Sequence, residues 1–300
     1  LSHMANGVSQ LHGATARAMW RGSEGAAPII SITNGVHVKT WQNPQIRQTF
    51  EVNGNLWKTH FQLKKLLLRE IENRTGVTLD LDTLTLGFGH RAEAHKRGGL
   101  IFHRPNVIEP LLREGVIQLI FSGKSHPEDD WGKKIVANMA EMAYRFPQSV
   151  VFLENYDMEL ARLLTSGCDV WLGTSQRPLE ASGISGIKAA LNGVLHLSVL
   201  DGWWPEGCLH GVNGWQFGGG YDGPEQTMVD AFSLYEVLLN EVIPTYYEDQ
   251  RRWQGMMRAS IANALHRFSS ARMLGEYYNL LYLPPATLQR IRREQVTEVH

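Results

Sequence analysis

Cysteine is scarce in this chain: only Cys168 and Cys208 occur among its 300 residues. A chain of this length with two cysteines does not rest on a disulfide scaffold, which favours a reducing compartment. Long hydrophobic runs are also missing, because no apolar stretch reaches the ~20 residues that a membrane-spanning helix needs. No signal peptide is visible either. We therefore expect a soluble, cytoplasmic protein without a membrane partner.

Neither sign of charge dominates the sequence. Lysine and arginine together number 29, aspartate and glutamate number 30, and the two kinds are interspersed. Such a balance gives no electrostatic footprint for nucleic acid, so we expect no nucleic-acid partner. Cys208 and His210 lie close together in the sequence, but two further ligands at suitable spacing are lacking, and we expect no metal site.

Hydrophobic residues make up 43% of the chain, which is enough to bury a large core. Apolar strands are expected at residues 83–88, 116–121, 149–153, 169–172 and 194–199, and helices at 57–73, 131–144 and 158–165. This alternation predicts an α/β fold, with a Rossmann-like parallel sheet and helices on both faces. Elsewhere we expect a helix over 4–20, a strand over 29–32 and a mostly helical stretch over 226–282.

The run from Glu180 to Gly193 carries the strongest functional signal. Its small residues lead into a helix-like pattern that contains Lys188 and stops near Gly193. Backbone N–H groups at a helix N-terminus bind anions such as phosphate, and glycines let the backbone approach closely. A lysine about one turn into that helix can form a Schiff base when it is desolvated. The run favours a phosphorylated aldehyde cofactor, with an ordinary loop–helix junction and a solvated lysine as an equal alternative.

Other chemically rich segments also follow predicted strands, at residues 87–97 and 154–156. In open parallel sheets, ligands bind beyond the carboxyl ends of the strands. Cations at such an edge hold phosphate groups through charge-assisted hydrogen bonds. We therefore expect one crevice to gather Arg91, Lys96, Tyr156, Glu180 and Lys188.

The run 180–193 resembles the pyridoxal-phosphate attachment motif of the α-glucan (glycogen or maltodextrin) phosphorylases. Its continuation, residues 200–206 and 213–215, is similar to the short bacterial and archaeal branch of that family. Further matching stretches follow in the family's order at residues 6–13, 33–36 with Trp41, 123–127, 152–156, 230–231 and 243–247. Because these collinear matches run from about residue 2 to about residue 283, the resemblance covers nearly the whole chain.

This resemblance implies the carboxyl-terminal domain of a GT-B glycosyltransferase. Family members carry a large amino-terminal domain before the stretch that matches residues 6–13. We therefore expect residues 1–33 to be the end of that missing domain and residues 34–225 to form the Rossmann-like cofactor- and phosphate-binding domain. Residues 226–300 should form a helical extension that packs back on the fold. The missing amino-terminal domain is then an expected partner, and a homodimer stays open.

The resemblance also implies roles for individual residues. It makes Lys188 the attachment point of pyridoxal 5'-phosphate and groups Lys188, Arg91 and Lys96 as the catalytic residues. Lys96 would bind the cofactor phosphate and Arg91 the substrate phosphate. The other implied cofactor contacts are Trp41 and Tyr156 at the ring, and Gly183, Ile184 and Ser185 around the phosphate. The implied contacts to the glucosyl unit are Asn34, Glu180, Ser182 and Gly183.

The implied activity is phosphorolysis of an α-1,4-glucan, either glycogen or maltodextrin. Inorganic phosphate would attack the terminal glucosidic bond and release glucose 1-phosphate with retention. The phosphate of the cofactor, rather than its ring, would exchange a proton with the substrate phosphate.

Several residues depart from the family pattern. Ile184 stands where the family has threonine, His90 where a basic residue precedes Arg91, and His95 where tyrosine precedes Lys96. A lost hydrogen bond to a charged group costs roughly 1.5–3 kcal/mol, so several losses would weaken phosphate binding. Two further hypotheses therefore stay open. One is a catalytically impaired relic or α-glucan-binding subunit of the same fold, and the other is a nucleotide-sugar glycosyltransferase whose lysine holds no cofactor.

Overall fold

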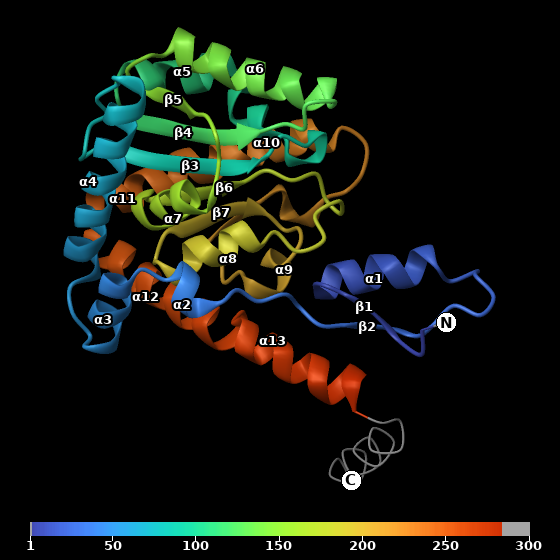
Figure 1. Cartoon of the computed structure of the whole chain (residues 1–300). Coiled ribbons are helices and arrows are strands. Elements are labelled where there is room, and N and C mark those ends of the chain that lie inside the picture. Colours follow the sequence, from blue (N-terminus) through green and yellow to red (C-terminus); the bar gives the residue numbers. More distant parts are fainter. Residues whose placement is uncertain (1, 284–300) are drawn as a thin grey trace.

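The computed structural model describes residues 2–283 of the chain. Its centre is a six-stranded sheet in the order β5-β4-β3-β6-β7-β8, in which every neighbouring pair is parallel (Figure 1). The strands are β3 (Leu84–Arg91), β4 (Ile117–Lys124), β5 (Val150–Leu153), β6 (Val170–Gly173), β7 (Leu195–Val199) and β8 (Gly214–Phe217). The winding direction reverses between β3 and β6, as in a Rossmann-like doubly wound sheet. The predicted α/β fold is confirmed.

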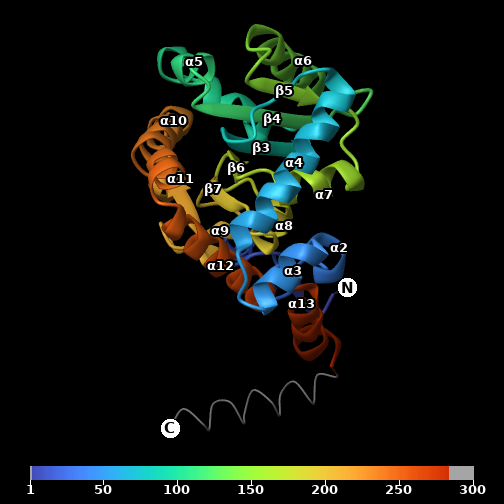
Figure 2. The same cartoon turned by 90° about the vertical axis from the view of Figure 1, so that its left-hand side faces the viewer.

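Helices cover both faces of this sheet. On one face lie α4 (Leu56–Thr75), α7 (Met158–Gly167) and α8 (Ile184–Leu191), whose buried side chains pack on Ile120 and Trp171 of the sheet. On the other face lie α5 (Pro105–Arg113), α6 (Asp130–Arg145) and α10 (Gln226–Val237), which pack on Phe88 and Phe121. Figure 2 shows α4 crossing in front of the edge at which the strands begin. The opposite, carboxyl edge of the sheet is therefore free for a site.

The amino-terminal segment forms a small unit beside the main sheet, visible in blue in Figure 1. The predicted helix over 4–20 is wrong at its start, because β1 (Ala5–Gly7) pairs in parallel with β2 (Ile29–Ser31) and α1 begins only at Gln10–Met19. Ser9 caps this helix by accepting a hydrogen bond from the His12 N–H at 3.0 Å. Gly7 must approach the α1 backbone, since a Cβ at Gly7 would lie 2.4 Å from the nitrogen of Gly13.

Several elements were not predicted from the sequence. They are α2 (Val38–Trp41), α3 (Pro44–Glu51), α5, α9 (Trp204–Gly207) and β8. Proline opens α3 and α5 at a first-turn position, where its missing N–H has no partner to lose. The short helices η1 (Ala94–Lys96), η2 (Gly98–Phe102) and η3 (Gly218–Gly220) complete the loops. The predicted basic segment 87–97 is thus partly strand, because β3 extends to Arg91.

The carboxyl-terminal part is helical, as predicted for residues 226–282. After α10 come η4 (Leu238–Val242), α11 (Ile243–Glu248), α12 (Gln250–Arg267), α13 (Ser270–Tyr277) and η5 (Tyr278–Tyr282). The start of α13 joins the amino-terminal segment through a bridge between Val36 and Ser269. The expected extension to residue 300 lies partly outside the described residues, since the structure describes the chain to residue 283. The expected boundaries after residues 33 and 225 stay predictions.

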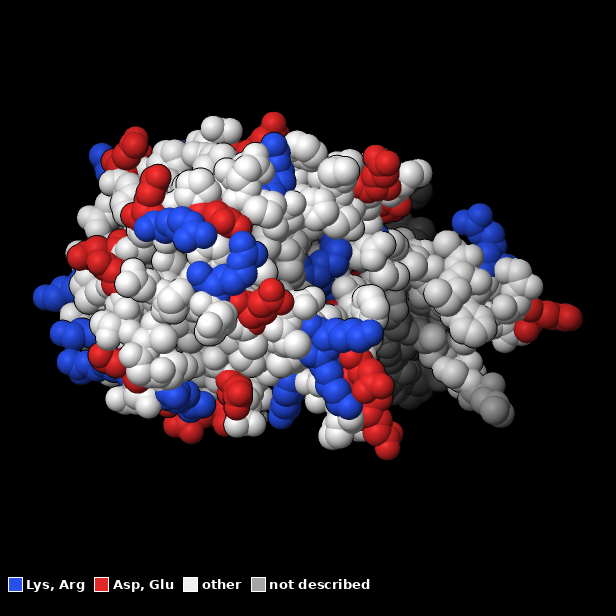
Figure 3. Space-filling view, turned by 90° about the horizontal axis from the view of Figure 1, so that it is seen from above, with Lys and Arg blue, Asp and Glu red and all other residues white. Residues whose placement is uncertain are grey.

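Charged side chains of both signs are interspersed over the face seen in Figure 3. Ion pairs one helical turn apart also occur, such as Arg47 with Glu51 on α3 and Arg74 with Glu70 on α4. Among residues 2–283, no helix has both the length and the apolar character needed to cross a membrane.

Candidate functional site

Cationic and polar side chains surround a pocket of about 380 Å³ at the carboxyl edge of the sheet. Its walls come mainly from the end of β3 and from the turn that starts α8, close to the point where the winding of the sheet reverses. The lining residues are Val8, Asn34, Gly89, His90, Arg91, Glu93, Lys96, Tyr156, Glu180, Ala181, Ser182, Gly183, Ile184, Ser185 and Lys188. Every residue expected at the site lines this pocket except Trp41.

Lys188 lies on α8, lines the pocket and also contacts Trp41, which lies outside the pocket lining. Its Nζ lies 3.4 Å from the centre of the Trp41 ring, so the two expected cofactor residues are in contact. Helix α2, which carries Trp41, is fixed to α8 by two side-chain amides. Asn192 donates to the Trp41 carbonyl at 2.8 Å, and Gln42 donates to the Leu191 carbonyl at 2.9 Å. Burial lowers the pKa of the Lys188 amine to about 8, which favours a neutral, nucleophilic amine.

The turn before α8 presents backbone amides to the pocket. Gly183 adopts a φ of +75°, a left-handed conformation that glycine reaches without strain. The N–H groups of a helix's first turn have no partner within the helix, so those of Ile184 and Ser185 are offered at this end of α8. The buried Ser182 hydroxyl has no hydrogen-bond partner among residues 2–283. An anion fits this end of the helix.

Lys96 and Glu180 form an ion pair inside the pocket. The Glu180 backbone N–H donates to Asp201 at 3.0 Å, and the Ser175 hydroxyl donates to the same carboxylate oxygen at 3.0 Å. Burial raises the pKa of Asp201 to about 6, although these hydrogen bonds favour its charged form. The Lys96 carbonyl accepts from the Thr174 hydroxyl at 2.6 Å, which ties η1 to the loop after β6. The backbone of Glu180 is thus anchored to Asp201, and the backbone of Lys96 is anchored to Thr174.

His90 lies deeper than the cations, on the wall that Lys96 also lines. Its ring packs edge-on against Phe88 and Trp171, with ring centres 4.8 and 6.1 Å apart. Burial holds the pKa of His90 well below 6.5, and the nearby positive charges of Lys96 and Lys188 lower it further. The imidazole is therefore uncharged at neutral pH while the pocket contains no anion.

Arg91 lies at the mouth of the pocket rather than inside it. Its side chain is 81% exposed, and its Nε lies 3.6 Å from the Glu93 carboxylate. The guanidinium is therefore available to a ligand that arrives from solvent. Arg97, the other arginine of this segment, is committed elsewhere, because it pairs with Asp230 at 2.5 Å and donates to the Ser175 carbonyl at 2.8 Å.

Tyr156 forms an apolar wall of the pocket. Its ring lies so close to β3 that a Cβ at Gly89 would meet it at 2.9 Å. Burial raises the pKa of the Tyr156 phenol to about 12, so the group stays neutral. Ile184 turns partly to solvent, with 40% of its surface exposed, and offers no hydroxyl to the turn. The Tyr156 ring thus gives a flat apolar surface to the pocket that Lys188 also lines.

Comparison with known protein families matches residues 51–204 to the carbohydrate phosphorylases. The chain belongs to the carbohydrate phosphorylase family. The matched residues contain α4, the sheet from β3 to β7, and helix α8 with Lys188. The resemblance inferred from the sequence is therefore confirmed.

Three relatives show how much of a family member this chain represents. It is 38% identical to the maltodextrin phosphorylase of Thermococcus litoralis, over 94% of this chain and 39% of that protein. Identity to the glycogen phosphorylase of Aquifex aeolicus is 36%, over 94% of this chain and 48% of that protein. The glycogen phosphorylase of Mycobacterium tuberculosis strain H37Rv is 38% identical, over 98% of this chain and 40% of that protein. The chain thus spans 39–48% of the length of these phosphorylases.

Asp201 is a site residue that the sequence reasoning missed. One feature of the sequence could have pointed to it. Asp201 comes two residues after the predicted strand at residues 194–199, at the edge of the sheet where ligands are expected. Its role depends on accepting the Glu180 N–H across 21 residues of sequence, which no local pattern reveals.

Gly202, next to Asp201, supports the turn that carries Ser182. Its φ is +56°, and a Cβ there would lie 2.4 Å from the Ser182 carbonyl oxygen. We expect Gly202→Ala to cost about 1–2 kcal/mol for the left-handed backbone and about 1–3 kcal/mol more for the contact. Urea unfolding measures this loss.

Gly255→Ala is the matched control for this prediction, since Gly255 lies within α12 and a Cβ there meets nothing within 4 Å. Alanine is the better helix former, so the control should gain roughly 0.5–1 kcal/mol. Equal unfolding free energies for the two variants would contradict the assigned contact.

Proposed function

We propose that this chain is the cofactor- and phosphate-binding part of a pyridoxal-phosphate-dependent α-glucan phosphorylase. The reaction is phosphorolysis of terminal α-1,4-glucosidic bonds of glycogen or maltodextrin, which releases glucose 1-phosphate with retention. The observation that carries the proposal is the pocket itself. It places the desolvated amine of Lys188, the cation of Lys96 and the amides of the α8 turn around one space of about 380 Å³.

The residues of the pocket fit pyridoxal phosphate. Lys188 supplies the amine that its aldehyde needs, and burial keeps much of that amine neutral near pH 8. The left-handed Gly183 and the unpartnered Ser182 hydroxyl leave polar groups facing an anion at the helix end. Trp41 and Tyr156 offer flat apolar surfaces for the ring. Ile184 offers the phosphate no hydroxyl, whereas threonine would. The uncharged His90 offers it less positive charge than a permanent cation would.

When bound, the cofactor supplies a phosphate group that exchanges a proton with the substrate phosphate. Lys188 anchors the cofactor, and Lys96 with the N–H groups of Ile184 and Ser185 holds its phosphate. Arg91, exposed at the mouth, captures the incoming inorganic phosphate. Positive charge on both sides of the reacting phosphate stabilises the charge that develops there.

The glucosyl unit would lie beside the loop that Asp201 supports. Glu180, Ser182 and Gly183 line the pocket on that side, and Asn34 faces them from the amino-terminal segment. The rest of the glucan site would come from an amino-terminal GT-B domain, of which residues 1–33 are the proposed end. We place the protein in the cytoplasm and leave homodimer formation as a proposal.

Borohydride reduction after incubation with pyridoxal phosphate tests this function. Mass spectrometry should find one pyridoxyl group, attached to Lys188. Glucose 1-phosphate release from maltodextrin is then assayed with this chain alone and with a complete amino-terminal half. An unmodified Lys188 removes the cofactor-dependent function.

A modified Lys188 without phosphorolysis in either assay would instead favour a catalytically impaired, α-glucan-binding subunit. His90 and Ile184 are the observations that support this second candidate, because neither supplies a permanent charge or a hydroxyl to the phosphate. Ile184→Thr restores the hydroxyl. If the missing hydroxyl is what impairs phosphorolysis, this variant should bind the cofactor more tightly.

The reactivity of Lys188 should follow its own titration. The neutral amine attacks the aldehyde, and an ordinary lysine has a pKa of about 10.4. Because burial lowers the pKa of Lys188 to about 8, the initial rate of reducible adduct formation should rise up to about pH 8 and then level off. A free lysine-containing peptide serves as the control, and its rate should keep rising to about pH 10. Parallel curves for Lys188 and the peptide would contradict this prediction.

A further inference from the structure

His90 occupies a wall shared by two cavities. One is the pocket of about 380 Å³, and the other is a small polar cavity of about 30 Å³ behind the turn before α8. Lys96, Gly183 and Ser185 line both spaces together with His90. An anion that sits on the Gly183–Ser185 turn within reach of Lys96 therefore lies beside the His90 ring.

The lysines and the arginine that line this pocket are either already close to a carboxylate or proposed for another role. Lys96 is already paired with Glu180, and Arg91 lies exposed at the mouth beside Glu93. Lys188 is the residue proposed to be used for attachment. His90 is the half-buried imidazole that lines both cavities and can add a positive charge when an anion arrives, whereas His196 lines the smaller cavity alone.

All titratable groups around His90 bear on its protonation. They are Lys96 and His95 on η1, His196 on β7, Lys188 on α8, Glu180 before α8, Asp201 after β7, and Arg91 and Glu93 at the end of β3. The cations and the apolar walls oppose a proton on His90 in the empty pocket. A phosphate dianion in contact with the ring reverses that balance, because opposite charge at short distance favours the charged imidazole.

We infer that His90 makes the binding of a phosphorylated ligand proton-linked, because its imidazole takes up a proton as the phosphate enters beside Lys96. This inference rests on the proposed function and deepens it by assigning a specificity role to His90. The proton comes from solvent and stays on the imidazole, and no covalent bond changes. The contribution of the phosphate group to cofactor affinity then rises as pH falls, by at most tenfold per pH unit for one proton.

Paired ligands separate this effect from the chemistry at Lys188. The affinities of the full 300-residue chain for pyridoxal phosphate and for pyridoxal are measured by absorbance between pH 6 and pH 8.5. Both ligands react with the same amine, so the ratio of the two affinities reports on the phosphate group alone. In the wild type this ratio should increase several-fold from pH 8 to pH 6.5.

Variants at position 90 assign the effect. His90→Asn should remove the increase and leave the opposite, weaker trend that comes from the phosphate itself, whose second pKa is about 6. His90→Lys should keep a high ratio throughout the range. His95→Asn is the matched control, since His95 is a neighbouring histidine on η1, and it should keep the wild-type slope.

Calorimetry provides a readout that needs no variant. Titration of the wild type at pH 7 in two buffers of different ionisation enthalpy should show more proton uptake with pyridoxal phosphate than with pyridoxal, since any proton that Lys188 releases is common to both ligands. A flat affinity ratio with no excess proton uptake overturns the inference, as does a slope that His90→Asn retains. If neither ligand attaches to Lys188, the proposed function fails instead.

Discussion

Lys188→Arg will abolish retention of pyridoxal phosphate by this protein. Arginine keeps a positive charge near Trp41, but its guanidinium stays protonated and does not condense with the aldehyde as the lysine amine does. We expect no reducible adduct at position 188 and a loss of more than 100-fold in cofactor affinity, since each factor of ten corresponds to about 1.4 kcal/mol. Borohydride trapping with peptide mapping measures the adduct, and absorbance titration measures the affinity.

Lys133→Arg is the control for that experiment. Lys133 lies on α6 with half of its side chain exposed, and its partner is the exposed Asp130. The same substitution there should leave cofactor retention unchanged. An adduct that persists in Lys188→Arg, at any other lysine and with wild-type affinity, would show that the pocket is not the attachment site.

The central sheet could be predicted because its strands are buried on both faces and read as short apolar runs. Strand β8 (Gly214–Phe217) escaped prediction, since it is short and contains a glycine and a glutamine. The helix over 4–20 was over-extended for a different reason. Val8, Leu11, Ala14 and Met19 have helical spacing, but the expected helix started too early, at residue 4, because Ala5–Gly7 pair with β2 instead. In both segments the strand depends on pairing with a neighbouring strand, which the local sequence does not show.

The candidate site also has parts that the local sequence predicts and parts that depend on tertiary contacts. The run that contains Gly183 and Lys188, a turn followed by the start of α8, is a local feature, and its composition favoured an anion beside an amine. The pairing of Lys96 with Glu180 spans 84 residues of sequence and depends on the neighbouring ends of β3 and β6. The first six residues of β3 are buried, His90 is half-buried and Arg91 is exposed, because the strand leaves the covered part of the sheet at its carboxyl end.

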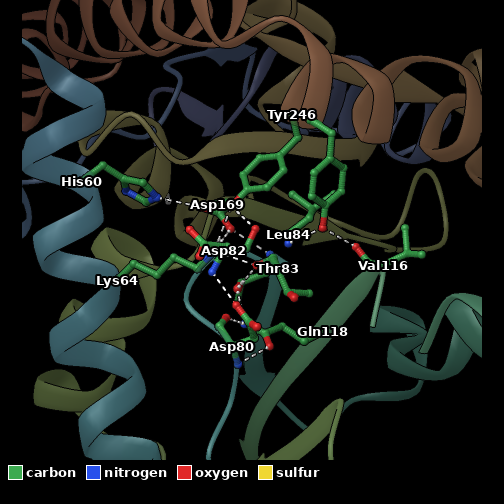
Figure 4. Close-up of polar contacts among 12 residues, drawn as sticks. His60, Lys64, Asp80, Asp82, Thr83, Leu84, Val116, Gln118, Asp169 and Tyr246 are labelled. Carbon is green, nitrogen blue, oxygen red and sulfur yellow. Dashed lines mark hydrogen bonds and ion pairs between the residues drawn. The ribbon is translucent and has the colours of Figure 1, made fainter. Parts of the chain in front are cut away.

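A second cluster of charges lies at the opposite edge of the sheet, where the strands begin (Figure 4). Lys64 of α4 and Asp169, just before β6, are almost fully buried and lie 2.6 Å apart. His60 Nε2 lies 2.8 Å from the other Asp169 oxygen, and Lys64 also donates to the Tyr246 hydroxyl at 3.0 Å. Burial alone would raise the pKa of Asp169, but Lys64 and the hydrogen bond with His60 hold it below its usual range. The cluster joins α4, the sheet and α11.

Lys64→Met should destabilise the protein by about 3–5 kcal/mol at pH 7, because it leaves the Asp169 carboxylate buried without its cation. Urea unfolding of the variant measures the loss. Lys65→Met is the matched control, since Lys65 is the next residue of the same helix and is exposed. A surface substitution of that kind should change stability by less than about 0.5 kcal/mol.

The pH dependence of the stability difference between wild type and Lys64→Met tests whether the unpaired Asp169 carboxylate causes the loss. In the wild type, the lowered pKa of Asp169 stabilises the fold above the carboxyl's unfolded pKa of about 3.9, and this stabilisation is lost as pH falls through the lower folded value. In Lys64→Met, burial raises the pKa of Asp169, so protonation relieves the unpaired charge and the gap to wild type should shrink from pH 7 to pH 5. Lys64→Met combined with Asp169→Asn should recover most of the stability at pH 7, because no buried charge remains unpaired. A gap that stays constant with pH, and a double variant as unstable as Lys64→Met, would show that lost packing rather than the unpaired carboxylate causes the effect.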